Sequence, residues 1–187
     1  MSQASEISLE ALAERAERAG VAAPPVERWN PPDCGVLDLR IDREGHWFHE
    51  GRPIHREALV RLFATIMRRE PDGRFVLVTP VEKLAITVED APFLAVEMSA
   101  SERAGEPLLA FRTNVGDLVE AGPEHPLRFV SDAEGFRPYL LVRGGLEARL
   151  TRSLAFDLAN LARERDGRWG IASGGGFFPL PDMSDHV

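Results

Sequence analysis

The segment Asp42-Arg43-Glu44-Gly45 recurs as Asp132-Ala133-Glu134-Gly135, and two further landmarks follow each copy in the same order. A helix is expected to open after Arg56 in the first copy and after Arg152 in the second. The turn Asp72-Gly73-Arg74-Phe75 is then matched by Asp166-Gly167-Arg168-Trp169. One acid–glycine turn alone carries little weight, because such turns are common. Three landmarks in order indicate an internal duplication.

The residues around these landmarks predict which elements each copy contains. Leu37, Leu39 and Ile41 alternate with polar neighbours, the pattern of a strand with one buried face. Residues 46–49 are expected to return as a second strand of a hairpin. Helices are expected over about 55–69 and 151–165, and strands over 75–78 and 84–88. Each copy is therefore predicted to be an α+β unit, with its helix on one face of an antiparallel sheet.

The predicted organisation has three parts. Residues 1–34 would form a helix that Ser8 caps and Gly20 ends, followed by a proline-rich connector. Residues 35–92 would be the first unit, and residues 93–187 a second, larger unit. Short predicted strands between 93 and 150 give the second unit a curved or barrel-like sheet that carries the last helix. Duplicated units commonly meet along a cleft, so a ligand is expected between them.

Composition excludes several classes of protein. The chain has 187 residues, of which 44% are hydrophobic and 28% charged, which excludes a disordered or fibrous chain. Its net charge of −8 argues against nucleic-acid or anionic-membrane partners. No membrane-spanning stretch or secretory signal is evident, and with a single cysteine, Cys34, a cytoplasmic location is expected.

Several longer segments resemble the bacterial family known as domain of unknown function 1285. The resemblance covers about residues 30–180 and rests on the following segments: Trp47, Gly51-Arg52-Pro53-Ile54, Leu62-Phe63, Leu77-Val78-Thr79-Pro80-Val81-Glu82-Lys83, Val88-Glu89-Asp90-Ala91-Pro92-Phe93, Phe111-Arg112-Thr113-Asn114 and Leu140-Leu141-Val142-Arg143-Gly144-Gly145-Leu146. It implies a duplicated α+β fold whose second domain is like a pleckstrin-homology domain. It also implies a nucleotide-like ligand between the domains and a role in signalling.

The first candidate site is the turn from Thr79 to Lys83 together with Asp90. A hydroxyl, a cation and the carboxylates of Glu82 and Asp90 could hold a phosphate or a base edge. Lys83 is the only lysine among 22 basic residues, which is consistent with a need for a compact ammonium. The alternative is a pair of exposed, ion-paired turns.

The second candidate site combines two polar segments of the larger unit. Arg112-Thr113-Asn114 and Arg143-Gly144-Gly145 offer guanidinium groups and backbone amides that could grip an anion, although the glycines could equally form a simple turn. Arg152 joins this set because a repeated arginine could meet its counterpart across the duplication, with an anion between them.

Metal and nucleophile chemistry find little support in the sequence. His46 and His49 would point to opposite faces of a strand, so no metal site is expected. Asp33 beside Cys34 would disfavour a thiolate, and nothing marks a histidine partner for Ser173.

The sequence therefore favours a cytoplasmic protein that binds a small anion, plausibly a nucleotide-like molecule, over an enzyme. A hydrolase of phosphorylated or nucleotide substrates and a protein-interaction module remain alternatives. The sequence names no cofactor, protein partner or oligomeric state. The ligand-binding residues it predicts are Thr79, Glu82, Lys83, Asp90, Arg112, Thr113, Asn114, Arg143, Gly144, Gly145 and Arg152.

Overall fold

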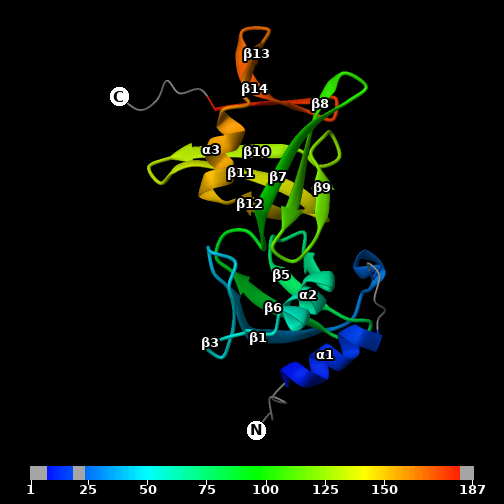
Figure 1. Cartoon of the computed structure of the whole chain (residues 1–187). Helices are drawn as coiled ribbons and strands as arrows, with labels where there is room; N and C mark the ends of the chain where they lie inside the picture. Colours follow the sequence, from blue (N-terminus) through cyan, green and yellow to red (C-terminus); the bar gives the residue numbers. More distant parts are fainter. Residues whose placement is uncertain (1–7, 19–23, 182–187) are drawn as a thin grey trace. The chain divides into compact units, whose positions relative to one another are not determined.

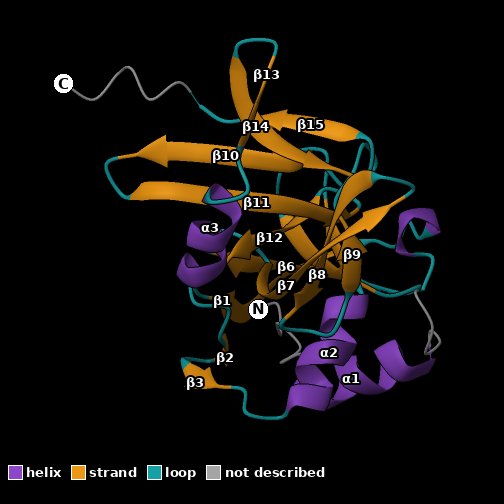
Figure 2. Cartoon of the chain, turned by 45° about the horizontal axis from the view of Figure 1, so that its top comes forward, coloured by secondary structure: helices purple, strands orange, loops and turns teal. Residues whose placement is uncertain are grey.

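The computed structural model describes residues 8–18 and 24–181, and the chain divides into two compact units, Met1–Asp90 and Ala91–Val187. The predicted end of the first helix at Gly20 lies outside the described residues. Strands dominate both units and the helices are few (Figure 1, Figure 2). The α+β class predicted from the sequence is thus confirmed. No helix within the described ranges is long and apolar enough to cross a bilayer.

The N-terminal unit is built on one six-stranded sheet in the order β3-β2-β1-β6-β5-β4. Its neighbours pair antiparallel except β1 and β6, which are parallel and lie at the centre. Its elements are α1 (Leu9–Arg18), η1 (Val26–Arg28), β1 (Asp33–Ile41), β2 (Trp47–His49), β3 (Arg52–Pro53), α2 (Glu57–Thr65), β4 (Met67–Arg69), β5 (Phe75–Val78) and β6 (Lys83–Val88).

The C-terminal unit holds a second six-stranded sheet, in the order β10-β11-β12-β7-β8-β9, and a three-stranded sheet, β13-β14-β15. Again only the central pair, β12 with β7, is parallel among the described strands. Its elements are β7 (Phe93–Arg103), β8 (Glu106–Thr113), β9 (Leu118–Glu120), β10 (Leu127–Asp132), β11 (Gly135–Arg143), β12 (Leu146–Leu150), α3 (Arg152–Ala159), β13 (Arg163–Arg165), β14 (Arg168–Ser173) and β15 (Gly176–Pro179).

The two large sheets share one topology. In each, two three-stranded meanders join through a parallel pair of the first and last strands, so that β1 to β6 correspond to β7 to β12. The three sequence landmarks follow a different correspondence. Their first copy lies in β1–β6, with α2 between the two meanders, and their second copy lies in β10–β15, with α3 between the two meanders. The two correspondences differ, because β10 corresponds to β4 in the sheets but to β1 in the landmarks. The similarity of the two domains thus rests on the shared sheet topology, and the landmark repeat is offset from it. The predicted antiparallel pairing holds within each meander, and the sequence missed the one parallel contact that joins the two meanders of each large sheet.

Burial follows the predicted alternation. On β1, Leu37, Leu39 and Ile41 are buried whereas Val36 is 77% exposed. Phe63 of α2 and Phe93 of β7 are fully buried in their respective units. Helix α3 packs on β7, β11 and β12 through Leu154, Ala155 and Leu158, as the amphipathic pattern predicts.

The helices α2 and α3 both end earlier than expected. The residues predicted as the last turn of α2 form β4, which pairs with β5 across the Asp72-Gly73 turn. In the second, Leu161 and Ala162 lie beyond α3 and are half-exposed, and β13 follows them. The reason is the same in each case: the acid–glycine turn closes a hairpin, which needs a strand on both sides.

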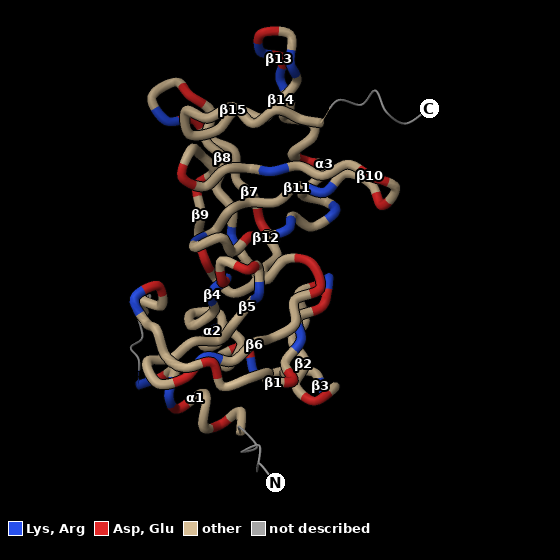
Figure 3. The backbone as a smooth tube through the Cα atoms, turned by 180° about the vertical axis from the view of Figure 1, so that it is seen from behind, with Lys and Arg blue, Asp and Glu red and all other residues tan. Residues whose placement is uncertain are grey.

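The sheet of the C-terminal unit is open. Its order ends at β10 on one side and at β9 on the other, and no pairing joins these edges among the described residues. The barrel-like closure expected from the sequence is therefore not formed. Basic and acidic residues are both scattered over the two units (Figure 3).

Candidate functional site

The turn between β5 and β6 uses its polar side chains to hold its own structure. The hydroxyl of Thr79 is fully buried and accepts hydrogen bonds from the backbone amides of Val81 and Glu82, at 3.4 and 3.3 Å. The carboxylate of Glu82 is buried and pairs with Arg15 of α1. Two residues predicted to bind ligand therefore have protein partners. Asp90 lies half-buried in the bend after β6.

Lys83 belongs to a small ionic cluster inside the N-terminal unit. Its ammonium lies 3.1 Å from Oε2 of Glu70, whose other oxygen accepts a 2.6 Å hydrogen bond from Arg68. Burial alone would raise the pKa of Glu70, but hydrogen bonds from Lys83 and Arg68 outweigh it and hold the pKa below its usual value. Arg68 also donates to the carbonyls of Val26 and Trp29, at 2.8 Å each. The cluster thus ties the proline-rich connector to the sheet.

In the C-terminal unit, the structure brings together Thr113, Asn114 and Arg143. Arg143 donates to Oδ2 of Asp117 at 2.8 Å, and its guanidinium carbon lies 5.0 Å from the ring centre of Phe93. The Thr113 hydroxyl accepts from the Asp117 amide at 3.0 Å. Asn114 accepts from the Leu94 amide at 3.0 Å. This cluster fastens the β8–β9 loop to β7 and β11.

The remaining predicted residues of the second candidate site also have local roles. Gly144 and Gly145 both have positive φ, 49° and 76°, and form the tight turn of the β11–β12 hairpin. Arg112 pairs with Glu97 across β7 and β8, which lowers the pKa of the Glu97 carboxyl, chiefly through the hydrogen bond from Arg112. Both side chains of that pair are exposed.

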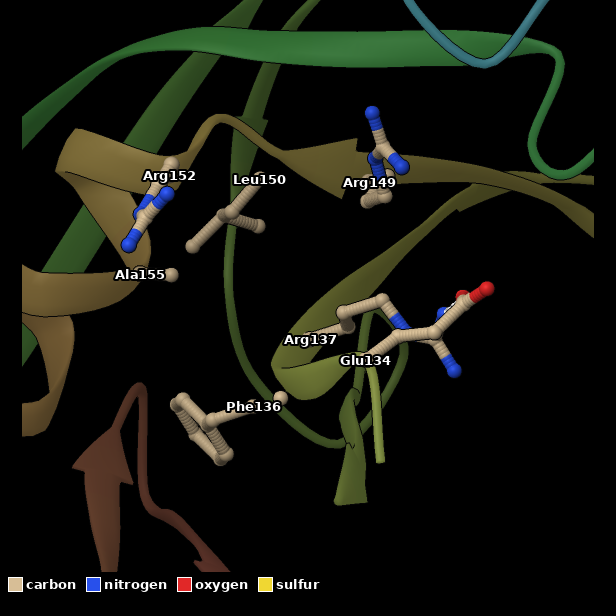
Figure 4. A pocket seen from close by; sticks show the side chains of 8 residues that line it. Glu134, Phe136, Arg137, Arg149, Leu150, Arg152 and Ala155 are labelled. Carbon is tan, nitrogen blue, oxygen red and sulfur yellow. Dashed lines mark hydrogen bonds and ion pairs between the residues drawn. The ribbon is translucent and has the colours of Figure 1, made fainter. Parts of the chain in front are cut away.

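Arg152 is different, because it lines a pocket of about 390 Å³ in the C-terminal unit (Figure 4). It is the first residue of α3 and is exposed, and its side chain makes no hydrogen bond or ion pair with another described residue. The pocket is lined by Glu134, Gly135, Phe136, Arg137, Arg149, Leu150, Arg152 and Ala155. Three arginines thus face one hollow.

The strand register explains why a hollow forms here. Strand β12 pairs with β11 up to Arg149 opposite Tyr139, and it then leaves to begin α3. Strand β11 continues to Gly135 and pairs there only with β10. The pocket lies at this step, and in Figure 4 Arg149 and Arg152 stand on either side of Leu150, with the Phe136 ring farther down. The junction of a strand and a helix therefore supplies both arginines.

The three arginines differ in their electrostatic state. Arg137 pairs with Asp132 and with Glu134, yet its Nε atom is buried without a hydrogen-bond partner. Burial lowers the pKa of Arg137, but the charges of Asp132, Tyr139 and Glu134 outweigh it and raise the pKa above its usual value. Its charge is thus compensated by two carboxylates. Arg152, in contrast, lines the pocket without an ion pair to any described residue.

Sequence reasoning selected Arg152 and missed Arg137 and Arg149. A signal was present in the helix start: Thr151 is the N-cap, its hydroxyl accepts from the Leu154 amide, and the first turn of α3 contains no acidic residue. A cation at the positive end of a helix dipole is unfavourable without a nearby anion. Arg137 could not be found in this way, because only the fold brings β11 to the helix start.

The histidines and the serine weighed in the sequence lie apart from this pocket. His46 contacts Asp42 at 3.3 Å in the β1–β2 turn, and no group of three potential metal ligands occurs within the described ranges. Ser173 is fully buried and uses its hydroxyl structurally, accepting from the Leu109 amide at 2.8 Å and donating to the Ala121 carbonyl at 2.7 Å.

The chain is thus a two-domain α+β protein with open sheets, and its C-terminal domain carries an arginine-lined pocket. Its two halves match the N-terminal domain of DUF1285 over residues 24–91 and the C-terminal domain of DUF1285 over residues 92–180, both described as of unknown function. The chain belongs to the DUF1285 family, as its motifs predict.

Two solved structures of this family are similar to the chain. A DUF1285 family protein from Silicibacter pomeroyi DSS-3 shares 45% identity, with 90% of this chain and 93% of that chain covered and a TM-score of 0.83. A DUF1285 family protein from Shewanella baltica OS155 shares 28% identity, with 67% and 92% covered and a TM-score of 0.53. No curated protein matches the chain.

Proposed function

We propose that this protein binds a small anion in the arginine pocket of its C-terminal unit. The observation that carries the proposal is Arg152: an exposed guanidinium that lines a hollow of about 390 Å³ without an ion pair to any described residue. Guanidinium groups present planar sets of donors that match phosphate and carboxylate oxygens. Such a group is suited to an anion that arrives from solution.

The electrostatic setting supports the same conclusion. The chain as a whole carries a net charge of −8, so a local excess of positive charge is unusual in it. Helix α3 adds the positive end of its dipole to that excess, and no acidic residue in its first turn offsets it. An anion bound at Arg152 would offset the unfavourable placement of this cation at the positive end of the helix dipole.

Binding can be tested by thermal unfolding with inorganic phosphate, pyrophosphate and ribose 5-phosphate. A ligand at 100 times its dissociation constant stabilises the fold by about 2.7 kcal/mol, a shift of several degrees for a chain of this size. Arg152→Gln should weaken binding by about ten- to a hundredfold, because it removes a charge-assisted hydrogen bond.

Arg56→Gln is the matched control. Arg56 is also exposed and stands at the start of a helix, as the N-cap of α2, but Glu57 follows it in the first turn. Anion affinity should be unchanged by Arg56→Gln. If none of the three anions shifts the melting temperature, or if both variants lose the shift equally, the proposal is wrong.

The finer expectations from the sequence remain proposals as well. A role in signalling would follow if the ligand were a signalling nucleotide. The pleckstrin-homology likeness concerns the same C-terminal unit that carries the pocket. A hydrolase would turn over a bound phosphate ester, which the same samples would reveal as released phosphate. A protein-interaction module would instead use exposed apolar residues, such as Phe156, which is 70% exposed.

A further inference from the structure

A second pocket of about 640 Å³ adjoins the arginine pocket in the C-terminal unit. It is lined by Ser131, Phe136, Ala159, Gly167, Arg168, Trp169, Pro179, Leu180 and Pro181. Phe136 lines both pockets, and in Figure 4 its ring lies on the side of the arginine pocket away from Arg149. The two hollows therefore share a wall.

Helix α3 forms a second shared wall. Arg152 and Ala155 line the arginine pocket, and Ala159 lines the second one. These positions follow each other along one face of the helix, at i, i+3 and i+7. Seven residues of helix span about 10 Å. The two pockets thus lie one after the other along α3, and together they are called the groove below. Arg152 lines its cationic end, and Ala159, about 10 Å farther along the helix axis, lines its more apolar end.

The apolar end is suited to a flat ring. Trp169 is 58% exposed there, although large aromatic residues are usually more buried. Phe136 is held in place by Phe129, whose ring stacks on it at 5.6 Å with an angle of 22° between the planes. The rest of the wall includes residues without long polar side chains, among them Gly167, Pro179 and Pro181. Aromatic faces of this kind stack with planar rings.

We infer that the anion bound by this protein also carries a planar aromatic ring, which stacks on Trp169 while the anionic group contacts Arg152. This inference rests on the proposed function and specifies its ligand: an aromatic phosphate or carboxylate that reaches from one pocket into the other. A mononucleotide has this division of charge. The positive charge of Arg168, which follows Gly167 and precedes Trp169 in the same pocket, suits the electron-rich face of such a ring.

The test compares four probes: ribose 5-phosphate, adenosine 5′-monophosphate, adenosine and octyl phosphate. Calorimetry gives their affinities for the full-length chain. Adenosine monophosphate should bind about tenfold or more tightly than ribose 5-phosphate, because base–aromatic stacking has that magnitude. Adenosine and octyl phosphate should each bind more weakly than adenosine monophosphate, since each lacks one of the two recognised groups.

Two variants separate the two ends of the groove. Trp169→Ala should weaken adenosine monophosphate to the level of ribose 5-phosphate and leave ribose 5-phosphate itself unchanged. Arg152→Gln should weaken both phosphates by similar factors. Both side chains are exposed, so the variants should fold, which circular dichroism would check. Trp169 is also a direct reporter: the aromatic probe should quench its fluorescence, whereas Trp29 and Trp47 belong to the N-terminal unit and should not respond. The Trp169→Ala variant should therefore lose the quenching.

The outcomes distinguish this inference from the proposed function. If ribose 5-phosphate binds through Arg152 but adenosine monophosphate binds no better, the aromatic inference is overturned and the anion site remains. If octyl phosphate binds as tightly as adenosine monophosphate, or Trp169→Ala has no effect, the groove does not select a ring. If no phosphate binds, the proposed function fails first and the inference fails with it.

Discussion

The ammonium of Lys83 lies 3.1 Å from Oε2 of Glu70, and the two side chains are only 14% and 11% exposed. Arg68 already occupies Oε1 of the same carboxylate and two backbone carbonyls of the connector. The remaining oxygen needs one donor from a compact cation, which a lysine supplies and the broader fork of an arginine does not. In an arginine-rich chain, this geometry gives a physical reason for a lysine at position 83.

Replacing Lys83 by methionine should therefore destabilise the N-terminal unit. The change removes the hydrogen bond from Lys83 to Oε2 of Glu70, and this oxygen then lacks a partner in a nearly buried carboxylate. The expected loss in the free energy of unfolding is about 1–3 kcal/mol. Urea unfolding measures the loss, with Arg61→Met as a control on an exposed helix pair. Phosphate affinity should not change. A variant that is as stable as the wild type but no longer binds phosphate would contradict this prediction and show that Lys83 contacts the ligand.

The same cluster predicts a dependence of stability on pH. The pKa of Glu70 is lowered in the folded chain, since the hydrogen bonds from Lys83 and Arg68 outweigh the effect of burial. A carboxyl of this kind stabilises the fold above its unfolded pKa, and its contribution is lost as pH falls through the lowered folded value. Stability should thus decline below about pH 4, and Glu70→Gln should flatten this part of the profile. An unchanged slope in Glu70→Gln would contradict the assignment.

The strands were the part of the fold most open to prediction. The alternation in β1 is local information, and the burial of Leu37, Leu39 and Ile41 follows it directly. The central parallel pairs were not accessible, because β1 with β6 and β7 with β12 join strands distant in sequence. Helical periodicity also continued into β4, where pairing with β5 decides the conformation.

The candidate site shows the same limit. Residue chemistry suggested Thr79, Glu82 and Lys83 as ligand contacts, but each has a protein partner that only the fold supplies. Arg152 was identified because a repeated helix start marks it. Arg137, which lines the same pocket, and Trp169, which lines the adjoining one, come from a strand and a sheet that the sequence alone does not bring to α3.

Ser173→Ala should be strongly destabilising for so small a change. The Ser173 hydroxyl is fully buried and joins β14 to the Leu109 amide and the Ala121 carbonyl. Alanine leaves both backbone groups buried without partners, at a cost of about 1–3 kcal/mol. Ser99→Ala on the exposed side of β7 is the control and should have little effect. Equal melting temperatures for the two variants would show that the buried hydroxyl contributes nothing.

The adjoining glycines offer a matched pair of substitutions in the β14–β15 turn. Gly174 and Gly175 both have positive φ, 57° and 79°, so alanine is strained at either position by about 1–2 kcal/mol. Only at Gly174 would the new methyl also meet backbone, 2.6 Å from the Ala121 carbonyl oxygen, whereas at Gly175 nothing lies within 4 Å. The Gly174 amide donates to the Pro107 carbonyl at 2.9 Å. The clash would therefore also weaken this hydrogen bond, which holds the β14–β15 turn against the start of β8. Gly174→Ala should thus be the more destabilising variant, with faster hydrogen exchange in β14 and β15. Equal losses would mean that the close approach at Ala121 can relax, and that backbone strain alone sets the cost of alanine at both positions.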